Sequence, residues 1–128
     1  MVEQYHGRDK TKASGTGGAR RFASDKKLAR YGSPFTATKV GEKDIRELRA
    51  GRGNTKKVKL KHVAFANVLQ KDGKVKKAKI RTVIETPDNR HYARQNVITK
   101  GAVIDTELGK VKVTNRVGQD GVVNGKLL

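Results

Sequence analysis

The chain has 128 residues, which suits one hydrophobic core of ordinary size. Its 30 Lys and Arg outnumber 12 Asp and Glu, and the net charge of +18 repels itself unless a polyanion or salt neutralises it. Cysteine is absent and the three histidines (His6, His62 and His91) are far apart in sequence, which argues against disulfides, zinc sites and other metal cofactors. We therefore expect a polyanionic partner and no cofactor.

Nucleic acid, an anionic membrane and an acidic protein are the candidate polyanions. The sequence has no run of about 18 apolar residues that could span a bilayer. Its first residues, MVEQYHGRDK, lack the apolar stretch of a signal peptide. We therefore expect a cytoplasmic protein with no membrane partner.

Residues 1–35 are predicted to form an extended basic arm. They contain eight basic residues, three acidic residues and five glycines, and their large apolar side chains are scattered. Such a segment cannot offset an ordering cost of roughly 1–2 kcal/mol per residue, so we expect it to be mobile when the protein is alone. A short helix over residues 24–30, capped by Ser24, is a marginal alternative.

Valine and isoleucine dominate the apolar residues from about residue 36 onward, which is typical of strands. In KKVKLKH, Val58 and Leu60 alternate with lysines, so we expect a strand with one solvated face. In HVAFANVLQ both alternating faces are apolar or small, which predicts a strand that is more buried. Residues 36–128 are thus predicted to form the folded domain.

The segment KVKKAKIRTVIET predicts a long strand that follows a hairpin. Asp72-Gly73 favours a two-residue hairpin turn, and Pro87 is expected to end the strand. Alternation places Lys77, Lys79, Arg81 and Glu85 outside. The residues expected inside are Ala78, Ile80, Thr82 and Ile84.

The segment PDNRHYARQN, residues 87–96, is expected to form a loop or a single helical turn. Further strands are predicted within residues 98–106, 109–117 and 122–128, with turns at TELG and VGQDG. The glycines of VGQDG suit positions of positive φ, and a phosphate-binding nest is the alternative for them. Several short strands at close spacing indicate a mainly β fold, a small barrel or a folded-over antiparallel sheet.

No reactive constellation emerges from the chemistry-bearing residues. The carboxylates are spread singly, and a triad of Asp88, His91 and a hydroxyl is a combination that any chain of this length offers. GTGG at residues 15–18 lacks the spacing of a phosphate-binding loop. We therefore expect neither an enzyme nor a small-molecule substrate.

The stretch NRHYARQN, residues 89–96, concentrates the groups that RNA-binding loops use. Arg90 and Arg94 can contact phosphates, and His91 and Tyr92 can stack on unpaired bases. Asn89 and Asn96 can read base edges or cap a turn, and Tyr92 can alternatively pack back onto the domain. The last 28 residues carry only four basic and three acidic side chains, so the polyanion is expected at the arm and the middle of the chain.

Two segments carry a family resemblance. NRHYARQNVITKGAVIDTELGKVKVTNRVGQDGVVNG closely resembles the C-terminal block of small-subunit ribosomal protein eight of the archaeal and eukaryotic type. TATKVGEKDIRELRAGRGNTKKVKL is similar to that family's central T-x-x-G-E and R-x-R-G-G-N-x-K segments, with residues 51–54 permuted. Val117 stands where the family pattern leads us to expect proline, Gly125-Lys126 replaces a more apolar pair, and the arm follows the pattern only loosely.

The resemblance implies a small six-stranded, barrel-like antiparallel domain with a long basic N-terminal extension. It also implies a monomer within the small ribosomal subunit, where the protein binds small-subunit ribosomal RNA beside neighbouring ribosomal proteins and has no enzymatic activity. The expected RNA contacts come from the arm and the middle of the chain: Arg8, Lys10, Lys12, Arg20, Arg21, Lys26, Lys27, Arg30, Lys39, Arg49, Arg52, Lys57, Lys59, Asn89, Arg90, His91, Tyr92, Arg94 and Lys100.

Two other classes of function remain open from sequence. One is a stand-alone basic binder of RNA or DNA, such as a chromatin protein or an RNA chaperone. The other is a small RNA-modifying enzyme. The first would be found free or on DNA, the second would show turnover, and a ribosomal protein would sediment with small subunits.

Overall fold

The computed structural model describes residues 4–5, 15–18 and 31–128, and the chain divides into two units, residues 1–35 and 36–128. In the first unit, β1 (Gln4–Tyr5) pairs antiparallel with β2 (Tyr31–Gly32). The eight basic residues expected in the arm and the helix considered for residues 24–30 lie outside the described residues.

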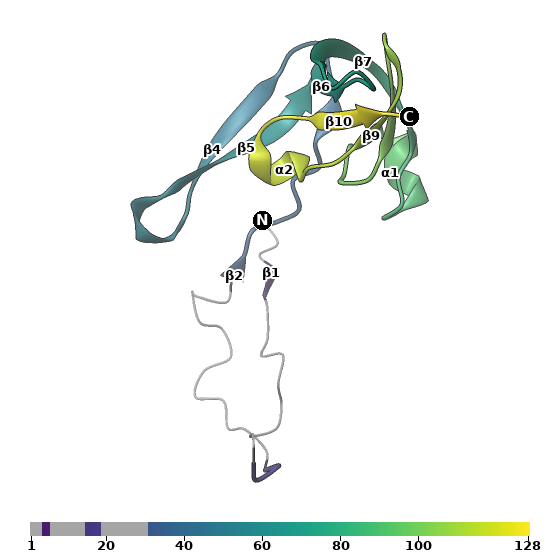
Figure 1. Ribbon diagram of the computed structural model, residues 1–128. Coiled ribbons are helices and arrows are strands. Elements are labelled where there is room, and N and C mark those ends of the chain that lie inside the picture. The colour runs from purple at the N-terminus through teal and green to yellow at the C-terminus, as the bar shows by residue number, and fades with distance from the viewer. Residues whose placement is uncertain (1–3, 6–14, 19–30) are drawn as a thin grey trace. The chain divides into compact units, whose positions relative to one another are not determined.

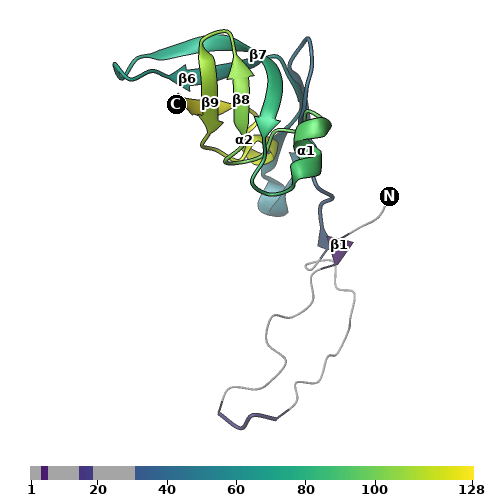
Figure 2. The same ribbon diagram turned by 90° about the vertical axis from the view of Figure 1, so that its right-hand side faces the viewer.

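The second unit contains a closed barrel of five strands in the order β10-β6-β7-β8-β9 (Figures 1 and 2). The mainly β prediction is confirmed, but the barrel has five strands where six were expected. It is also not wholly antiparallel, because β10 runs parallel to β6. The five strands are β6 (Phe65–Leu69), β7 (Val75–Glu85), β8 (Val103–Thr106), β9 (Gly109–Val113) and β10 (Asn124–Leu127).

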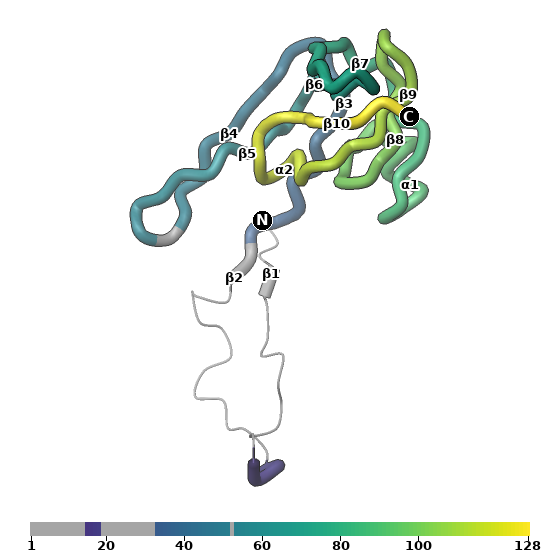
Figure 3. The backbone as a smooth tube through the Cα atoms, in the orientation of Figure 1, coloured from purple at the N-terminus to yellow at the C-terminus, as the bar shows by residue number. Residues whose placement is uncertain are grey.

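A second sheet of three strands adjoins the barrel in the order β3-β5-β4. Its members are β3 (Lys39–Val40), β4 (Ile45–Ala50) and β5 (Lys56–Val63), and a 3-10 turn, η2 (Arg52–Asn54), joins β4 to β5. The β4–β5 hairpin extends away from the barrel (Figures 1 and 3). Sequence reasoning identified β5 as a strand but not β4, so the hairpin was not predicted.

β5 and β6 meet at a bend centred on Ala64, whose N–H donates to Asp44 Oδ1 at 2.8 Å. The predicted alternation in β5 is confirmed, since Leu60 is buried and the lysines face outward. β6, however, is not buried on both faces. Ala66 and Val68 point into the barrel while Phe65 and Leu69 are exposed, because one side of the strand faces solvent.

β7 changes phase halfway along. Ala78 and Ile80 are buried as predicted, but the expectation for Thr82 and Ile84 is wrong: both are exposed, and Val83 is buried instead. The register against β8 shifts twice, between Ile80 and Thr82 and between Val83 and Glu85, and each irregularity adds a residue that moves the following side chains to the other face. The Val83 N–H donates to the side chain of Asn96 at 3.3 Å rather than continuing the regular ladder.

The predicted hairpin between β6 and β7 is confirmed, but its loop is longer than a two-residue turn. The Gln70 N–H donates to the Lys74 carbonyl at 2.9 Å, and the Gly73 N–H donates back to the Gln70 carbonyl at 3.1 Å. Gly73 has a φ of 77°. A turn followed by a left-handed glycine is the usual three-residue hairpin, which suits the twist of the flanking strands.

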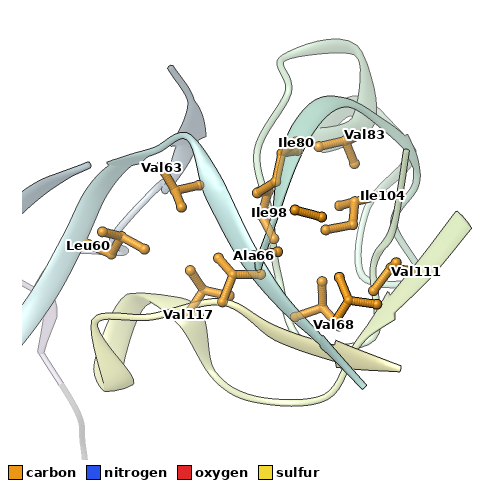
Figure 4. Packing of buried hydrophobic residues seen from close by; sticks show 13 residues of the cluster. Leu60, Val63, Ala66, Val68, Ile80, Val83, Ile98, Ile104, Val111 and Val117 are labelled. Carbon is orange, nitrogen blue, oxygen red and sulfur yellow. The ribbon is translucent and has the colours of Figure 1, made fainter. Parts of the chain in front are cut away.

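The core is built from small and medium aliphatic side chains supplied by both sheets (Figure 4). Leu60 and Val63 of β5 pack into the same cluster as Ile80, Ile104 and Val111 of the barrel. Valine and isoleucine fit the closely spaced interior of a five-stranded barrel, where larger side chains would strain the wall. β5 therefore joins the hairpin to the barrel core.

Two glycines adjust the closing segment of the chain. Gly121, with a φ of 71°, ends the short helix α2 (Val117–Asp120), and a Cβ there would lie 2.7 Å from Val58 Cγ1. This agrees with the positive φ predicted for VGQDG. Gly125 lies buried in β10, where an added Cβ would collide with Val111 Cγ1. Both glycines permit close approach of the last segment to its neighbours.

Candidate nucleic-acid interface

One face of the β4–β5 hairpin gathers four cations. Arg49 lies opposite Lys57, and Glu47 lies opposite Lys59 in the antiparallel register. Directly opposed residues project to the same side of a sheet, so Arg49, Lys57 and Lys59 share one face. The Lys61 ammonium joins them, because its Nζ lies 3.5 Å from Glu47 Oε2. We call Glu47, Arg49, Lys57, Lys59 and Lys61 the hairpin face.

The charges on the hairpin face perturb one another. Glu47 Oε1 accepts a hydrogen bond from Arg49 Nε at 3.2 Å, and this bond holds the pKa of Glu47 below its usual value. The pKa of Lys59 is also lowered, first by partial burial of its ammonium and then by repulsion from Arg49 and Lys61. Four cations around a single carboxylate leave a surplus that an anion would relieve.

The opposite face of the hairpin is different in character. Arg46 donates from Nε to the Gly121 carbonyl at 2.9 Å and pairs with Asp44 at 3.1 Å, so it ties β4 to the end of α2. Leu48 lies on the same side farther out and is 66% exposed. Arg52 lies at the tip, in the turn that joins the two strands. Gly53 and Asn54 of the same turn are in the left-handed region, at φ of 63° and 60°. The hairpin residues that were expected to contact RNA therefore lie on the hairpin face or at its tip.

The stretch from Asn89 forms the helical turn α1 (Arg90–Arg94). Asn89 is its N-cap: Oδ1 accepts from the His91 N–H at 2.9 Å, which satisfies a backbone donor that a helix otherwise leaves unpaired. Of the two alternatives that the sequence left open, a loop and a single helical turn, the structure has the helical turn, with Asn89 as its cap. Asn96 also serves the fold, with a φ of 52° and its side chain bonded to Val83.

Arg90 and Arg94 stand four residues apart and so lie on one side of α1, and both are exposed. His91 is exposed as well, whereas Tyr92 is half-buried. Residues 84–91 and Ala93 line an open depression of about 600 Å³, and Glu85 and Asp88 are among them. The surroundings of α1 are therefore of mixed charge, unlike the hairpin face.

Lys39 and Lys100 complete the expected contacts. Lys39 is exposed in β3, where it pairs with His62 of β5 and bridges to Val97 on the other side. It thus lies at the edge of the sheet that contains the hairpin, next to the segment that follows α1. Lys100 is exposed in a turn, and a Cβ added to the next residue, Gly101, would lie 3.3 Å from Pro87 Cγ, so this turn adjoins the loop before α1.

Sequence reasoning did not count Lys61 among the contacts, although its alternation with Val58 and Leu60 placed it on the same side as Lys59. Among the described residues, no group of three His, Asp or Glu side chains could hold a metal ion. In the same part of the chain, no helix is long and apolar enough to cross a membrane.

The model of one protein family, ribosomal protein S8e, matches residues 5–128. The chain belongs to this family. It is 46% identical over 128 residues to the small ribosomal subunit protein eS8 of Sulfolobus acidocaldarius, covering 99% of this chain and 98% of that protein. It is 43% identical over 129 residues to the eS8 of Nanoarchaeum equitans, covering 100% and 99%. The eS8 of Pyrobaculum calidifontis is 46% identical over 125 residues, covering 97% and 95%.

Membership of the S8e family confirms the resemblance read from the two sequence segments. S8e is a family of structural ribosomal proteins, so the prediction that the chain is not an enzyme is also confirmed. Val117, which stands where proline was expected, is the first residue of α2 and is buried. Proline is favoured at a first helical position because that N–H has no helical partner, and α2 forms here without it.

Proposed function

We propose that this chain is a structural constituent of the cytoplasmic small ribosomal subunit and binds small-subunit ribosomal RNA. The observation that supports RNA binding is the hairpin face, where Arg49, Lys57, Lys59 and Lys61 share one side of the sheet with a single carboxylate, Glu47. The eS8 names of the relatives support the subunit.

The hairpin face suits a phosphate backbone for a geometric reason. Residues two apart on a strand lie about 7 Å from one another, so Lys57, Lys59 and Lys61 form a row of charges, with Arg49 beside them on β4. Each phosphate that these side chains neutralise releases condensed counterions, which favours binding without any reading of bases. Burial lowers the pKa of Lys59 first and repulsion from Arg49 and Lys61 lowers it further, and a phosphate would relieve that repulsion.

The proposal extends to the other expected contacts. Arg90, His91, Arg94 and Lys100 supply a second contact region around α1, Lys39 lies between the two regions, and Arg52 marks the hairpin tip. Residues 1–35 supply the basic arm, with 36–128 as the domain that anchors it. We further propose that the protein is a monomer within the subunit, beside neighbouring ribosomal proteins.

The test is sedimentation of the full chain with small ribosomal subunits through gradients at high salt. Wild-type protein is expected with the subunits, and the triple variant Arg49→Ala, Lys57→Ala, Lys59→Ala is expected to dissociate at lower salt. In titrations with the RNA fragment that the protein protects, the slope of log K against log[salt] should fall in magnitude by roughly two to three, since each contact contributes about 0.7–0.9. Wild-type protein found free or on DNA would contradict the proposal and favour a stand-alone binder.

A further inference from the structure

The outer face of the barrel carries an aromatic ring that the proposed contacts do not use. Phe65 begins β6, points outward and is 40% exposed. Between residues 36 and 128 it is one of two aromatic residues, the other being Tyr92 of α1. Lys79 lies directly opposite Phe65 on β7, and Lys77 lies opposite Asn67. An exposed aromatic ring beside two lysines is the arrangement with which single-stranded nucleic acids are bound.

Phe65, Asn67 and Lys77 help to line a small cavity of about 140 Å³ between β6 and the segment that leads into β10. At about 30 Å³ per water molecule in the liquid, this space corresponds to roughly five waters, which admits one planar ring and excludes a double helix. Its lining combines apolar and polar groups: Asp44, Arg46, Leu60, Val63, Phe65, Asn67, Lys77, Val122 and Val123.

The polar lining is held in position by other contacts. Asp44 accepts from the Ala64 N–H at 2.8 Å and from Arg46 at 3.1 Å, and carboxylate lone pairs remain for a further donor. Asn67 Nδ2 donates to Asn124 Oδ1 at 3.0 Å, across the parallel pair of β6 and β10. Side chains fixed in advance lose little freedom when a ligand binds.

Lys77 shows which kind of contact the ring makes. Its Nζ lies 4.4 Å from the centroid of the Phe65 ring, in a cation–π arrangement. The lysine chain is long and flexible, so a stacked base can take the position over the ring while the ammonium follows the phosphate of the same nucleotide.

We infer that the cavity beside Phe65 binds one unstacked base of RNA, with the ring as its stacking surface and with Lys77 and Arg46 near the flanking phosphates. The inference rests on the proposed function, because it deepens RNA binding by the same domain. An acidic peptide fits less well, since its carboxylate would meet Asp44 in the cavity lining. A base presents N–H groups from which Asp44 can accept hydrogen bonds, and its neutral ring can pack against Phe65 and the valines of the cavity.

The test uses the absence of tryptophan from the sequence. In full-length Phe65→Trp protein the new indole is the single tryptophan, and stacking of a base quenches its fluorescence. A short oligouridine, whose bases are unpaired, is expected to quench it saturably, while a short RNA duplex at equal phosphate concentration quenches it less. Equal quenching by both RNAs would show a charge effect and overturn the inference. Quenching by an acidic peptide but not by oligouridine would overturn it in favour of a protein contact.

A pair of variants separates stacking from charge. Phe65→Leu should weaken oligouridine binding by roughly tenfold or more, with the salt slope unchanged, because a stacking surface but no charge is lost. Lys77→Gln should reduce the magnitude of the salt slope by about one. If wild-type protein binds the protected ribosomal fragment while Phe65→Leu leaves oligouridine binding unchanged, the inference fails and the proposed function stands. If wild-type protein binds no RNA, the proposed function itself fails.

Discussion

The β4–β5 hairpin is joined to the barrel by β5, whose Leu60 and Val63 pack into the barrel core, yet the side chains of the two regions provide different kinds of interaction. In the barrel, aliphatic side chains from five strands fill a closed interior, and burial of apolar surface stabilises it without a partner. One face of the hairpin carries four cations, and Leu48 is exposed on the other face. Along β5 the side chains change from exposed at Lys56 to buried at Leu60. Within β5, the side chains of one face therefore contribute to the core, and the lysines of the other face form the surface proposed to bind RNA.

The largest effect is expected from a charge placed inside the barrel. Ile80→Asp would bury an unpaired carboxylate at a site that is almost inaccessible, at a cost of several kcal/mol, which is a large part of a typical domain's stability. The neighbouring change Lys79→Asp alters an exposed side chain and should leave the fold intact while weakening RNA binding. Thermal unfolding followed by circular dichroism measures both. Equal stability of the two variants would contradict the assigned faces of β7.

A smaller loss is expected where the barrel closes. Gly125→Val would force a side chain against Val111, and overpacking of this kind costs about 1–3 kcal/mol. Lys126→Val is the matched control, since the side chain of the next residue in β10 is exposed. Denaturant unfolding should show a loss for the first variant alone, partly recovered when Val111→Ala is added. No recovery in the double variant would locate the strain elsewhere.

The third prediction compares charges around α1 with charges on the barrel. Arg90→Ala, Arg94→Ala and Lys100→Ala together should reduce the magnitude of the salt slope by roughly two to three, with strands retained by circular dichroism. The control triple Lys110→Ala, Lys112→Ala, Lys126→Ala removes equal charge from β9 and β10 and should reduce it by less than about one. Equal slopes for wild type and a folded α1 variant would assign α1 to solvent or to a protein neighbour.

The smallest effect concerns Glu47 on the hairpin face. Glu47→Gln should raise RNA affinity a few-fold, because the carboxylate that competes with phosphate for Arg49 and Lys61 is lost. Glu107→Gln, in the turn between β8 and β9, changes the net charge equally and should have less effect. Titration of the protected RNA fragment compares the two, and equal gains would show that only net charge matters.

The same residue predicts a pH dependence. Because the bond from Arg49 lowers the pKa of Glu47 in the folded protein, its contribution to stability is present above the unfolded value near 4.5 and is lost as the pH falls through the lower folded pKa. Glu47 is exposed and solvent screens its pairs, so the change is slight. The difference in unfolding free energy between wild type and Glu47→Gln should narrow as the solution becomes acidic. A difference that widens in acid would contradict this account.

Sequence alternation identified strands more reliably than it identified their inner faces. Ala78 and Ile80 were placed correctly because one period of two residues holds up to that point. Beyond that point the Val83 N–H donates to the side chain of Asn96 and the register shifts. A local sequence pattern cannot show that a backbone group bonds to a side chain 13 residues away. Residues 45–50 show no two-residue alternation of apolar side chains, so β4 forms because β5 supplies its partner.

The site was partly predictable for a related reason. Arg49, Lys57 and Lys59 were chosen by charge and by resemblance, and pairing across a turn brought them together without β4 being predicted. Asn89 proved to be a cap because its side chain lies within reach of the His91 N–H, a local rule that sequence reasoning had considered. Phe65 was missed because alternation alone does not say which face of β6 points outward, and the cavity beside it is lined by residues between positions 44 and 123.

The parallel pairing of β10 with β6 sets an order of events during synthesis. Asn67 on β6 finds its partner Asn124 on β10 across 57 residues of chain. At about 5–20 residues per second, β10 is translated roughly 3–11 s after β6. The β4–β5 hairpin has its two strands joined by a short turn and can pair well before that. A nascent chain can therefore form its cationic hairpin before the barrel has closed, and until then β6 has an unpaired edge that could pair with another chain.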